Sequence, residues 1–385
     1  MWAFLIRSGM EASMFKADRR LFLHFDMILL LLVLLVSGIA LCNLYSASFP
    51  YVGYGMAPWL KQLCYFGVMF FMSAFILCVD YKWLHQINYI FYFAVLGLLI
   101  LADIIGSSAG GSQRWINLGL FNLQPSEVAK ISMVICLASY YARKEVLDGY
   151  TLKQLLFPMA MLGLPFIMIL AQPDLGTALM LGIIFVSMTM FVNLRWSTYL
   201  ALGTFGIGAA VLGWLYVLKP YQRQRIETFL HPDQDLMGSG YQIFQSKIAI
   251  GSGGYFGKGY GEGPQGQLHF LPERHTDFAF AVLGEEWGFI GTFVFLALYF
   301  LMLLWGLYVA SQAKDRFGIL LAYGVVVLIF WQAVINLFMV LGFLPVVGIP
   351  LPLVSYGGSS LLTTCIGLAI LMNVRMRSFD PVNHC

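Results

Sequence analysis

Long apolar runs recur along the whole chain, and they constrain its fold more than any other feature. Each approaches the roughly 20 residues that a helix needs to cross a bilayer. Of the 385 residues, 60% are hydrophobic and 11% are charged, against about 25% charged in an ordinary soluble domain. The sequence therefore predicts an all-α polytopic membrane protein with about ten transmembrane helices: 27–44, 63–79, 87–104, 127–141, 155–170, 175–192, 199–218, 287–310, 317–341 and 353–374.

The basic residues predict how these helices are oriented, because cytoplasmic loops carry an excess of Lys and Arg. Both termini are then cytoplasmic, as a tail at 1–26 and a tail at 375–385, and 27–374 forms a single membrane domain. The long segment 219–276, between helices 7 and 8, is extracytoplasmic. The net charge of +3 says little about partners. The residues behind this orientation are Arg7, Lys16, Arg19, Arg20, Arg143, Lys144, Lys153, Lys314, Arg316, Arg375 and Arg377.

Cysteine and histidine spacing gives no sign of a cofactor. The six cysteines form no C-x-x-C pair, and most lie inside expected spans, so free buried thiols are expected. A disulfide between Cys42 and Cys64 is the alternative. All six histidines (His24, His85, His231, His269, His275 and His384) fall outside the expected spans, so no intramembrane pair could ligate a haem.

Three outward segments are longer than the other connections: 46–62, 106–126 and 219–276. Long ordered loops are usually functional, so function is expected on the outer face. Half of the residues from 251 to 266 are glycine, which permits tight turns and close backbone approach; a mobile surface loop is the alternative. The match to G-x-G-x-x-G at 261–266 is discarded, because it contains Pro264 and lacks the strand and helix of a nucleotide site.

The segment GSQRWINLGLFNLQPSEVAKI, residues 111–131, combines charges with a helix start. Glu127 and Lys130 lie three residues apart on one helix face, where they can pair. That pair could simply anchor the helix end. Alternatively, Arg114, Trp115 and Lys130 could hold an anionic ligand and an apolar or sugar surface.

Two further segments interrupt apolar runs. In AQPDLGTAL, residues 171–179, Asp174 is expected to cap the following helix. In GIPLPLVSYGGSSLL, residues 348–362, prolines and the Gly357–Ser360 cluster break helical regularity, which is tolerated at membrane depth only beside protein or a water-filled cavity. A polar cavity is favoured there, and close helix packing through small residues is the alternative.

The stretch FLPERHTDFAFAVLGEEWGFIG, residues 270–291, gathers charges directly before an apolar run. Asp277 belongs at the mouth of a membrane-embedded surface, although Thr276 or Asp277 could simply be a helix N-cap. Glu285 and Glu286 lie two turns further on, and either line the same cavity or mark an interfacial segment before a span that begins near Trp287.

Six motifs, in order, resemble one family. QRWINLG, QPSEVAK, QPDLGTAL, QSKIAIGSGG, LPERHTDFAFAVLGEEWG and PLPLVSYGGSS are similar to the motifs of the SEDS family of peptidoglycan glycosyltransferases, over about residues 26–377. LPERHTDF, with Arg274, resembles the branch that acts in cell elongation and rod-shape maintenance more than the division branch.

The resemblance implies polymerisation of lipid II on the outer face of a bacterial cytoplasmic (inner) membrane. The donor would be an undecaprenyl-pyrophosphate-linked glycan and the acceptor lipid II, with a β-1,4 bond made by inversion and undecaprenyl pyrophosphate released. The implied partners are a class B penicillin-binding protein transpeptidase and membrane lipids, and no nucleic acid. No cofactor is demanded, although a divalent cation (Mg or Mn) could assist.

The residues agree with that chemistry. An inverting transfer needs one base for the acceptor hydroxyl, and the family's essential aspartate corresponds to Asp277. The leaving pyrophosphate needs positive charge, for which Arg225 is a further candidate. The residues expected to bind substrate are Arg114, Trp115, Glu127, Lys130, Arg223, Lys247, Arg274, Ser355 and Ser359.

Two other functions use the same features. A flippase for a lipid-linked precursor would also place helices around a polar cavity, but Glu127, Lys130, Asp174 and Asp277 all fall toward the outer half of the spans, which favours one-sided chemistry. A scaffold that only binds partners would not need Asp277.

Overall fold

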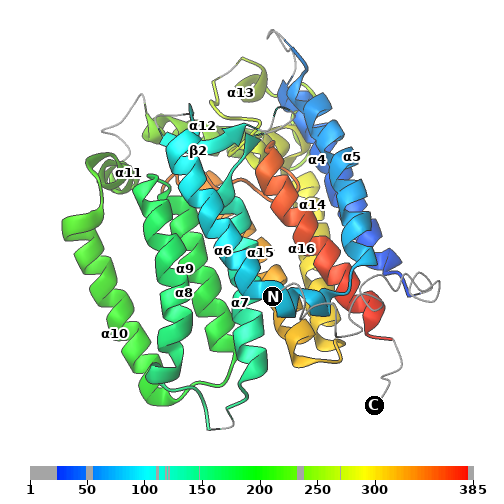
Figure 1. Ribbon diagram of the computed structural model, residues 1–385. Helices are drawn as coiled ribbons and strands as arrows, with labels where there is room; N and C mark the ends of the chain where they lie inside the picture. The colour runs from blue at the N-terminus through cyan, green and yellow to red at the C-terminus, as the bar shows by residue number, and fades with distance from the viewer. Residues whose placement is uncertain are drawn as a thin grey trace.

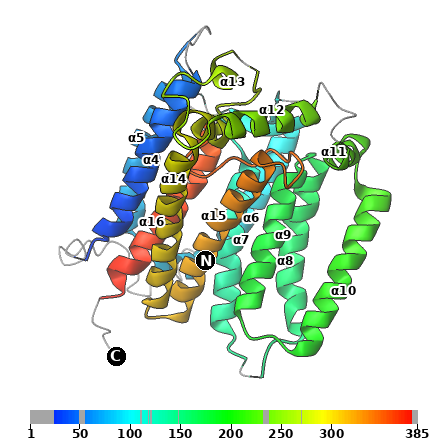
Figure 2. The same ribbon diagram turned by 180° about the vertical axis from the view of Figure 1, so that it is seen from behind.

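A helix occupies each of the ten expected spans (Figures 1 and 2). The computed structural model describes residues 24–48, 55–109, 112–117, 119, 122–146, 148–231, 238–268 and 270–379. Arg7, Lys16, Arg19, Arg20, His269, His384 and Cys385 lie outside them. The ten helices are α4 (Met27–Ser48), α5 (Pro58–Cys78), α6 (Tyr81–Ile105), α7 (Pro125–Arg143), α8 (Leu152–Ala171), α9 (Leu175–Phe191), α10 (Trp196–Leu212), α14 (Ala279–Ser311), α15 (Arg316–Val340) and α16 (Gly358–Arg377).

Length and composition allow most of these helices to cross a bilayer. In the described part of the chain, eight helices are long and apolar enough to do so, and α9 is apolar but shorter. The protein is therefore a multi-pass membrane protein, as expected, while the number of crossings stays a prediction. His85 lies inside α6 rather than before a span, because α6 begins at Tyr81.

Two helices form the centre of the bundle. Nearly every residue of α7 is buried, and α15 is buried along most of its length. The two pack against each other, and α7 also contacts α6 and α9. A Cβ on Gly324 of α15 would lie 2.6 Å from Val134 Cγ1 of α7, so the close approach of these helices requires a residue without a side chain. By contrast, α10 lies at the edge, with Thr198 as its buried residue.

The longer connections lie at one end of the bundle, which is uppermost in Figure 1 and is called the loop end below. The segment 106–126 contains an antiparallel sheet in the order β1-β2-β3, of β1 (Ser107–Ala109), β2 (Ser112–Asn117) and β3 (Asn122–Leu123). At the opposite end the described chain begins and ends together, where the rings of His24 and Phe379 stack with centroids 4.6 Å apart.

The segment 219–276 is more structured than a loop. After a π-helical turn (η1, Gly213–Val217), it forms α11 (Pro220–Leu230), α12 (Ser239–Ser252) and α13 (Pro264–Gln267). Helix α12 lies across the ends of α14 and α15 (Figure 2). It packs there because Ile243, Ser246 and Ala249 form a buried stripe at helical spacing.

The glycine-rich segment 251–266 is ordered and hydrogen-bonds to a break in α14, rather than forming a mobile loop. Helix α14 starts at Ala279, before the expected position, and is interrupted at Gly288, where φ is 65° and ψ is −164°. Backbone N–H groups of Lys258 and Gly259 donate to the carbonyls of Glu285 and Glu286, at 3.0 and 3.2 Å. In return, Phe289 and Ile290 donate to Gly254 and Tyr255, at 2.8 and 3.1 Å. These four bonds satisfy backbone groups that the break exposes.

The cysteine expectation is only partly met. Cys42, Cys64, Cys78, Cys136 and Cys365 are all free thiols, so the alternative disulfide between Cys42 and Cys64 is wrong. Cys136 is buried, but Cys42 and Cys64 are exposed, because they lie on the outward faces of two peripheral helices.

Candidate active site

A polar cavity of about 510 Å³ opens at the loop end of the bundle. Its walls come from β2, the starts of α7, α9 and α16, helices α11 and α12, and two irregular segments before α14 and α16. The residues that line it are Arg114, Trp115, Gln124, Glu127, Lys130, Asp174, Thr177, Met180, Arg225, Gln242, Glu273, Thr276, Asp277, Val346, Val347, Gly348, Ile349, Pro350, Tyr356, Gly357, Ser359 and Ser360.

Asp277 points its carboxylate into this cavity instead of capping a helix. The residue that caps α14 is Phe278, and no side chain bonds the exposed N–H groups there; Thr276 Oγ1 donates to Glu273 Oε2 at 2.8 Å. A Cβ on Gly348 would lie 3.6 Å from Asp277 Oδ2, so the carboxylate faces the backbone of the opposite wall. Within the described chain, its oxygens accept no hydrogen bond.

The surroundings of Asp277 make it a stronger base than an ordinary aspartate. Burial of its carboxyl raises its pKa from 3.8 to about 6, and the negative charge of Glu273 acts in the same direction, while Arg225 opposes both. A carboxylate with such a pKa is ionised at neutral pH and can still take up a proton. That combination is what general base catalysis requires.

Glu127 and Lys130 form the predicted pair on the first turns of α7. Lys130 Nζ lies 2.8 Å from Glu127 Oε1, and both side chains are almost fully buried. Glu127 Oε2 is buried without a partner in the described residues. A buried acceptor left unpaired costs free energy unless a ligand or water satisfies it.

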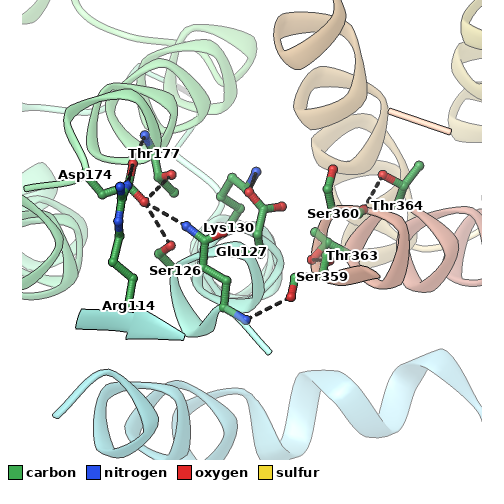
Figure 3. Close-up of polar contacts among 11 residues, drawn as sticks. Arg114, Ser126, Glu127, Lys130, Asp174, Thr177, Ser359, Ser360, Thr363 and Thr364 are labelled. Atoms are coloured by element: carbon green, nitrogen blue, oxygen red, sulfur yellow. Dashed lines mark hydrogen bonds and ion pairs between the residues drawn. The ribbon is translucent and has the colours of Figure 1, made fainter. Parts of the chain in front are cut away.

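Asp174 organises the wall beside that pair, as Figure 3 shows. It caps α9 as predicted, accepting from the Thr177 backbone at 3.2 Å. Its Oδ2 accepts from Gln124 Nε2 at 2.9 Å and from Ser126 Oγ at 3.3 Å. Arg114 Nη1 lies 3.8 Å from Oδ1, the oxygen that caps the helix. The capping residue is thus also the anchor that orients Arg114 at the cavity rim.

The segment between α15 and α16, together with the first turn of α16, forms the wall opposite Asp277. Ser359 donates to the Asn122 carbonyl at 2.7 Å and accepts from the Gln124 backbone at 2.9 Å, so it joins this wall to β3. Ser355, also expected in the site, lies behind the wall, because its hydroxyl accepts from the Leu351 backbone at 2.9 Å. The polar cavity that these residues predicted is present here.

Three cationic residues expected to bind substrate lie outside the cavity lining. Arg223 turns back and donates to the Leu215 carbonyl at 3.0 Å. Lys247 lies against Gly342, just after the end of α15. Arg274 is buried under the turn before Asp277, where burial lowers the pKa of its guanidinium.

Arg225 reaches the cavity in place of Arg223. The two are neighbours on α11 whose directions differ by about 200° at 100° per residue, so only one of them can face inward. Arg225 donates to the Val346 carbonyl at 3.1 Å. The sequence named Arg225 as a cationic candidate but could not rank it, and it gave no signal for Gln242 or Tyr356, which also line the cavity.

Glu285 and Glu286 do not line the cavity, although both are buried. Glu285 accepts from Lys258 Nζ at 2.8 Å and from the backbone of Gln265 and Gly266 at 3.2 and 3.3 Å. Glu286 accepts from Ser46 of α4. They hold the glycine-rich segment and α4 to the first part of α14.

The described residues contain no group of three or more His, Cys, Asp and Glu arranged to hold a metal ion. A divalent cation in the site therefore stays a prediction.

The fold and the cavity define a helical, multi-pass membrane protein with a polar, carboxylate-containing site at one end of its bundle. The family model for the FtsW, RodA and SpoVE proteins, described as "Cell cycle protein", matches residues 25–379. The chain belongs to this family, the SEDS family.

Relatives and solved structures agree with this membership. The chain is 41% identical over 291 residues to the peptidoglycan glycosyltransferase MrdB of Escherichia coli K12, covering 74% of this chain and 76% of the relative. It is 37% identical to a probable peptidoglycan glycosyltransferase FtsW of Trichlorobacter lovleyi, covering 91% and 93%.

Among solved structures, a chain from work on polymerization and crosslinking by a peptidoglycan synthase complex aligns with a TM-score of 0.78 and 31% identity, covering 93% of this chain and 99% of that one. The rod shape determining protein RodA of Thermus thermophilus aligns with a TM-score of 0.68 and 27% identity, covering 93% and 98%.

Proposed function

We propose that this protein is a peptidoglycan glycosyltransferase that polymerises lipid II during cell elongation, with Asp277 as its catalytic base. Family membership supports the reaction class, because relatives at 37% to 41% identity are named peptidoglycan glycosyltransferases. The observation that carries the assignment of the base is the Asp277 carboxylate, which faces the cavity without a hydrogen-bond partner in the described chain and has a raised pKa.

In the proposed reaction, an acceptor sugar hydroxyl attacks the anomeric carbon of the glycan donor from the side opposite its pyrophosphate. Asp277 takes the hydroxyl proton as the new C–O bond forms. The bond to the pyrophosphate breaks with its electron pair, and undecaprenyl pyrophosphate leaves. Proton transfer to a positioned base contributes roughly 10² to 10⁴ in rate.

Positive charge in the cavity would stabilise the departing pyrophosphate. Arg114, Lys130 and Arg225 all line the cavity, and stabilising the charge that develops in a transition state is commonly the largest catalytic effect. Glu127 holds Lys130 in place, and Asp174 does the same for Arg114. Arg114 and Lys130 are thus positioned before substrate arrives.

The proposed setting is a bacterial inner membrane, with the loop end and its cavity on the extracytoplasmic face. A class B penicillin-binding protein is the proposed partner, because one solved relative comes from a peptidoglycan synthase complex. Such a partner would cross-link the strands that this protein makes.

The test is polymerisation of labelled lipid II by the purified protein with its transpeptidase partner. Wild type should make glycan and Asp277→Asn should make none. The matched control is Asp103→Asn, which removes an exposed carboxylate near the loop end, outside the cavity lining, and should keep wild-type activity.

A neutral amide at position 277 avoids the burial of a charge, so Asp277→Asn should fold at least as well as wild type. Equal polymer from wild type and Asp277→Asn would exclude the base assignment. No polymer from folded, partner-bound wild type, together with transbilayer movement of lipid II in liposomes, would instead support the flippase.

A further inference from the structure

We propose that Asn336 is a positioning residue that fixes the Asp277 backbone against the opposite wall of the cavity. This inference rests on the proposed role of Asp277 as base. Asn336 lies on α15, outside the cavity lining, and its side chain has no exposure to solvent. It would therefore act through Asp277 and not by touching substrate.

The position of the Asp277 carboxylate depends on its backbone, because no hydrogen bond to the carboxylate holds it within the described chain. Asn336 Nδ2 donates to the Asp277 carbonyl at 2.9 Å. Two residues earlier, the His275 carbonyl accepts from the Tyr356 backbone at 2.8 Å. The next residue, Phe278, is fully buried. Among the described residues, Asn336 therefore supplies the one side-chain hydrogen bond to residue 277 itself.

The same Asn336 nitrogen also holds the facing wall. Its second N–H donates to the Ile349 carbonyl at 2.8 Å. Ile349 follows Gly348, whose α-carbon faces the Asp277 carboxylate and whose φ of +71° suits glycine. One amide group thus joins the segment that carries the base to the segment across from it, and sets the gap between them.

Such a bridge matters because a reacting group must be held closely. A misplacement of about 1 Å can cost about 10²-fold in rate even when its cause lies away from the chemistry. A carboxylic acid in place of the amide could donate at most one of the two hydrogen bonds, and an apolar side chain could donate neither. Asparagine is the residue whose NH₂ group supplies both.

Gln332 provides a matched control one helical turn away. It lies on α15 and is as deeply buried as Asn336, and neither polar atom of its side chain has a partner among the described residues. Replacing Gln332 removes a buried polar group from the same helix and leaves the hydrogen bonds of Asn336 to Asp277 and Ile349 in place.

The experiment measures kcat and KM for lipid II in the partner complex for wild type, Asn336→Leu, Asn336→Asp, Gln332→Leu and Asp277→Asn, with thermal unfolding of each. Both Asn336 variants should lower kcat about 10- to 100-fold, with KM within about twofold of wild type. Gln332→Leu should change neither constant by more than about twofold. If Asn336→Leu does not fold, the isosteric Asn336→Asp decides the outcome.

The inference is overturned if folded Asn336 variants keep wild-type kcat, if they lose no more than Gln332→Leu, or if only KM rises. Asp277→Asn separates this failure from that of the proposed function. If Asp277→Asn is inactive while the Asn336 variants are fully active, the base stands and its positioning by Asn336 does not. Polymer from Asp277→Asn at the wild-type rate would remove the base itself.

Discussion

A single carboxyl group, that of Asp277, links the electrostatics of the cavity to its chemistry. Its raised pKa has burial as the largest cause and Glu273 as the second. Because the base must be ionised to accept a proton, the enzyme should lose activity as the pH falls through the pKa of Asp277.

We predict that kcat/KM for lipid II polymerisation falls about tenfold for each pH unit below about 6, because kcat/KM reports the ionisation of the free enzyme. Glu273→Gln removes a negative charge that raises the pKa of Asp277, so its acidic limb should move to lower pH. The pH dependence of kcat/KM in the partner complex measures both. An acidic limb that stays in place in Glu273→Gln would contradict the electrostatic account.

At this scale, the sequence predicted which residue types would meet but not every neighbour that faces the cavity. Asp277, Glu127 and Lys130 could be predicted, because motif order and i,i+3 spacing do not depend on tertiary packing. The choice between Arg223 and Arg225 depends on the rotation of α11 against the bundle, which no local pattern specifies. Ser355 was misplaced for a similar reason, because its hydroxyl caps a backbone turn.

Among the elements, the glycine-rich segment that packs against the break in α14 leaves the least room for side chains. Gly257 has a φ of +79°, and a Cβ there would lie 2.0 Å from the Glu286 carbonyl oxygen. Any side chain would force the glycine-rich segment away from the break at Gly288. The four backbone bonds that close the break would then be lost together.

We therefore predict that Gly257→Ala lowers the thermal unfolding temperature of the purified protein by several degrees, as expected for a loss of about 1–3 kcal/mol. Gly251→Ala is the matched control, since a Cβ there meets nothing within 4 Å and alanine favours the α12 helix. Equal unfolding temperatures for the two variants would contradict this prediction and show that the glycine-rich segment tolerates a side chain at position 257.

The glycine-rich segment also shows where sequence reasoning stops at this scale. Composition left open whether it was mobile or ordered. The answer depends on backbone groups of α14 that become available only where that helix breaks, 30 residues after Lys258. The structured helices inside 219–276 were missed as well, because short amphipathic segments between spans resemble loops.

At the scale of the whole molecule, the first and last described residues lie at one end of the bundle and the cavity lies at the other. The orientation of the bundle in the membrane therefore decides on which side the reaction occurs. In a variant free of native cysteines, Phe256→Cys at the loop end should react with a membrane-impermeant maleimide added to intact spheroplasts. Lys314→Cys, between α14 and α15, should react only after permeabilisation. The reverse labelling pattern would place the cavity on the cytoplasmic face and contradict the proposed reaction.

The ten helices and their order were predictable, since each expected span overlaps a helix. Their arrangement was not, because lipid-facing and protein-facing apolar surfaces look alike in sequence. Burial of nearly all of α7, for example, follows from the simultaneous contacts of α6, α9 and α15 with it.

That central position of α7 has a consequence for how the protein is made. Among the described helices, α7 is not one of the eight that are long and apolar enough to enter a bilayer alone, and it carries the Glu127–Lys130 pair in its first turns. Two of its neighbours, α9 and α15, are synthesised after it. During membrane insertion, we therefore expect α7 to depend on α6 and on the later helices that enclose it in the finished bundle.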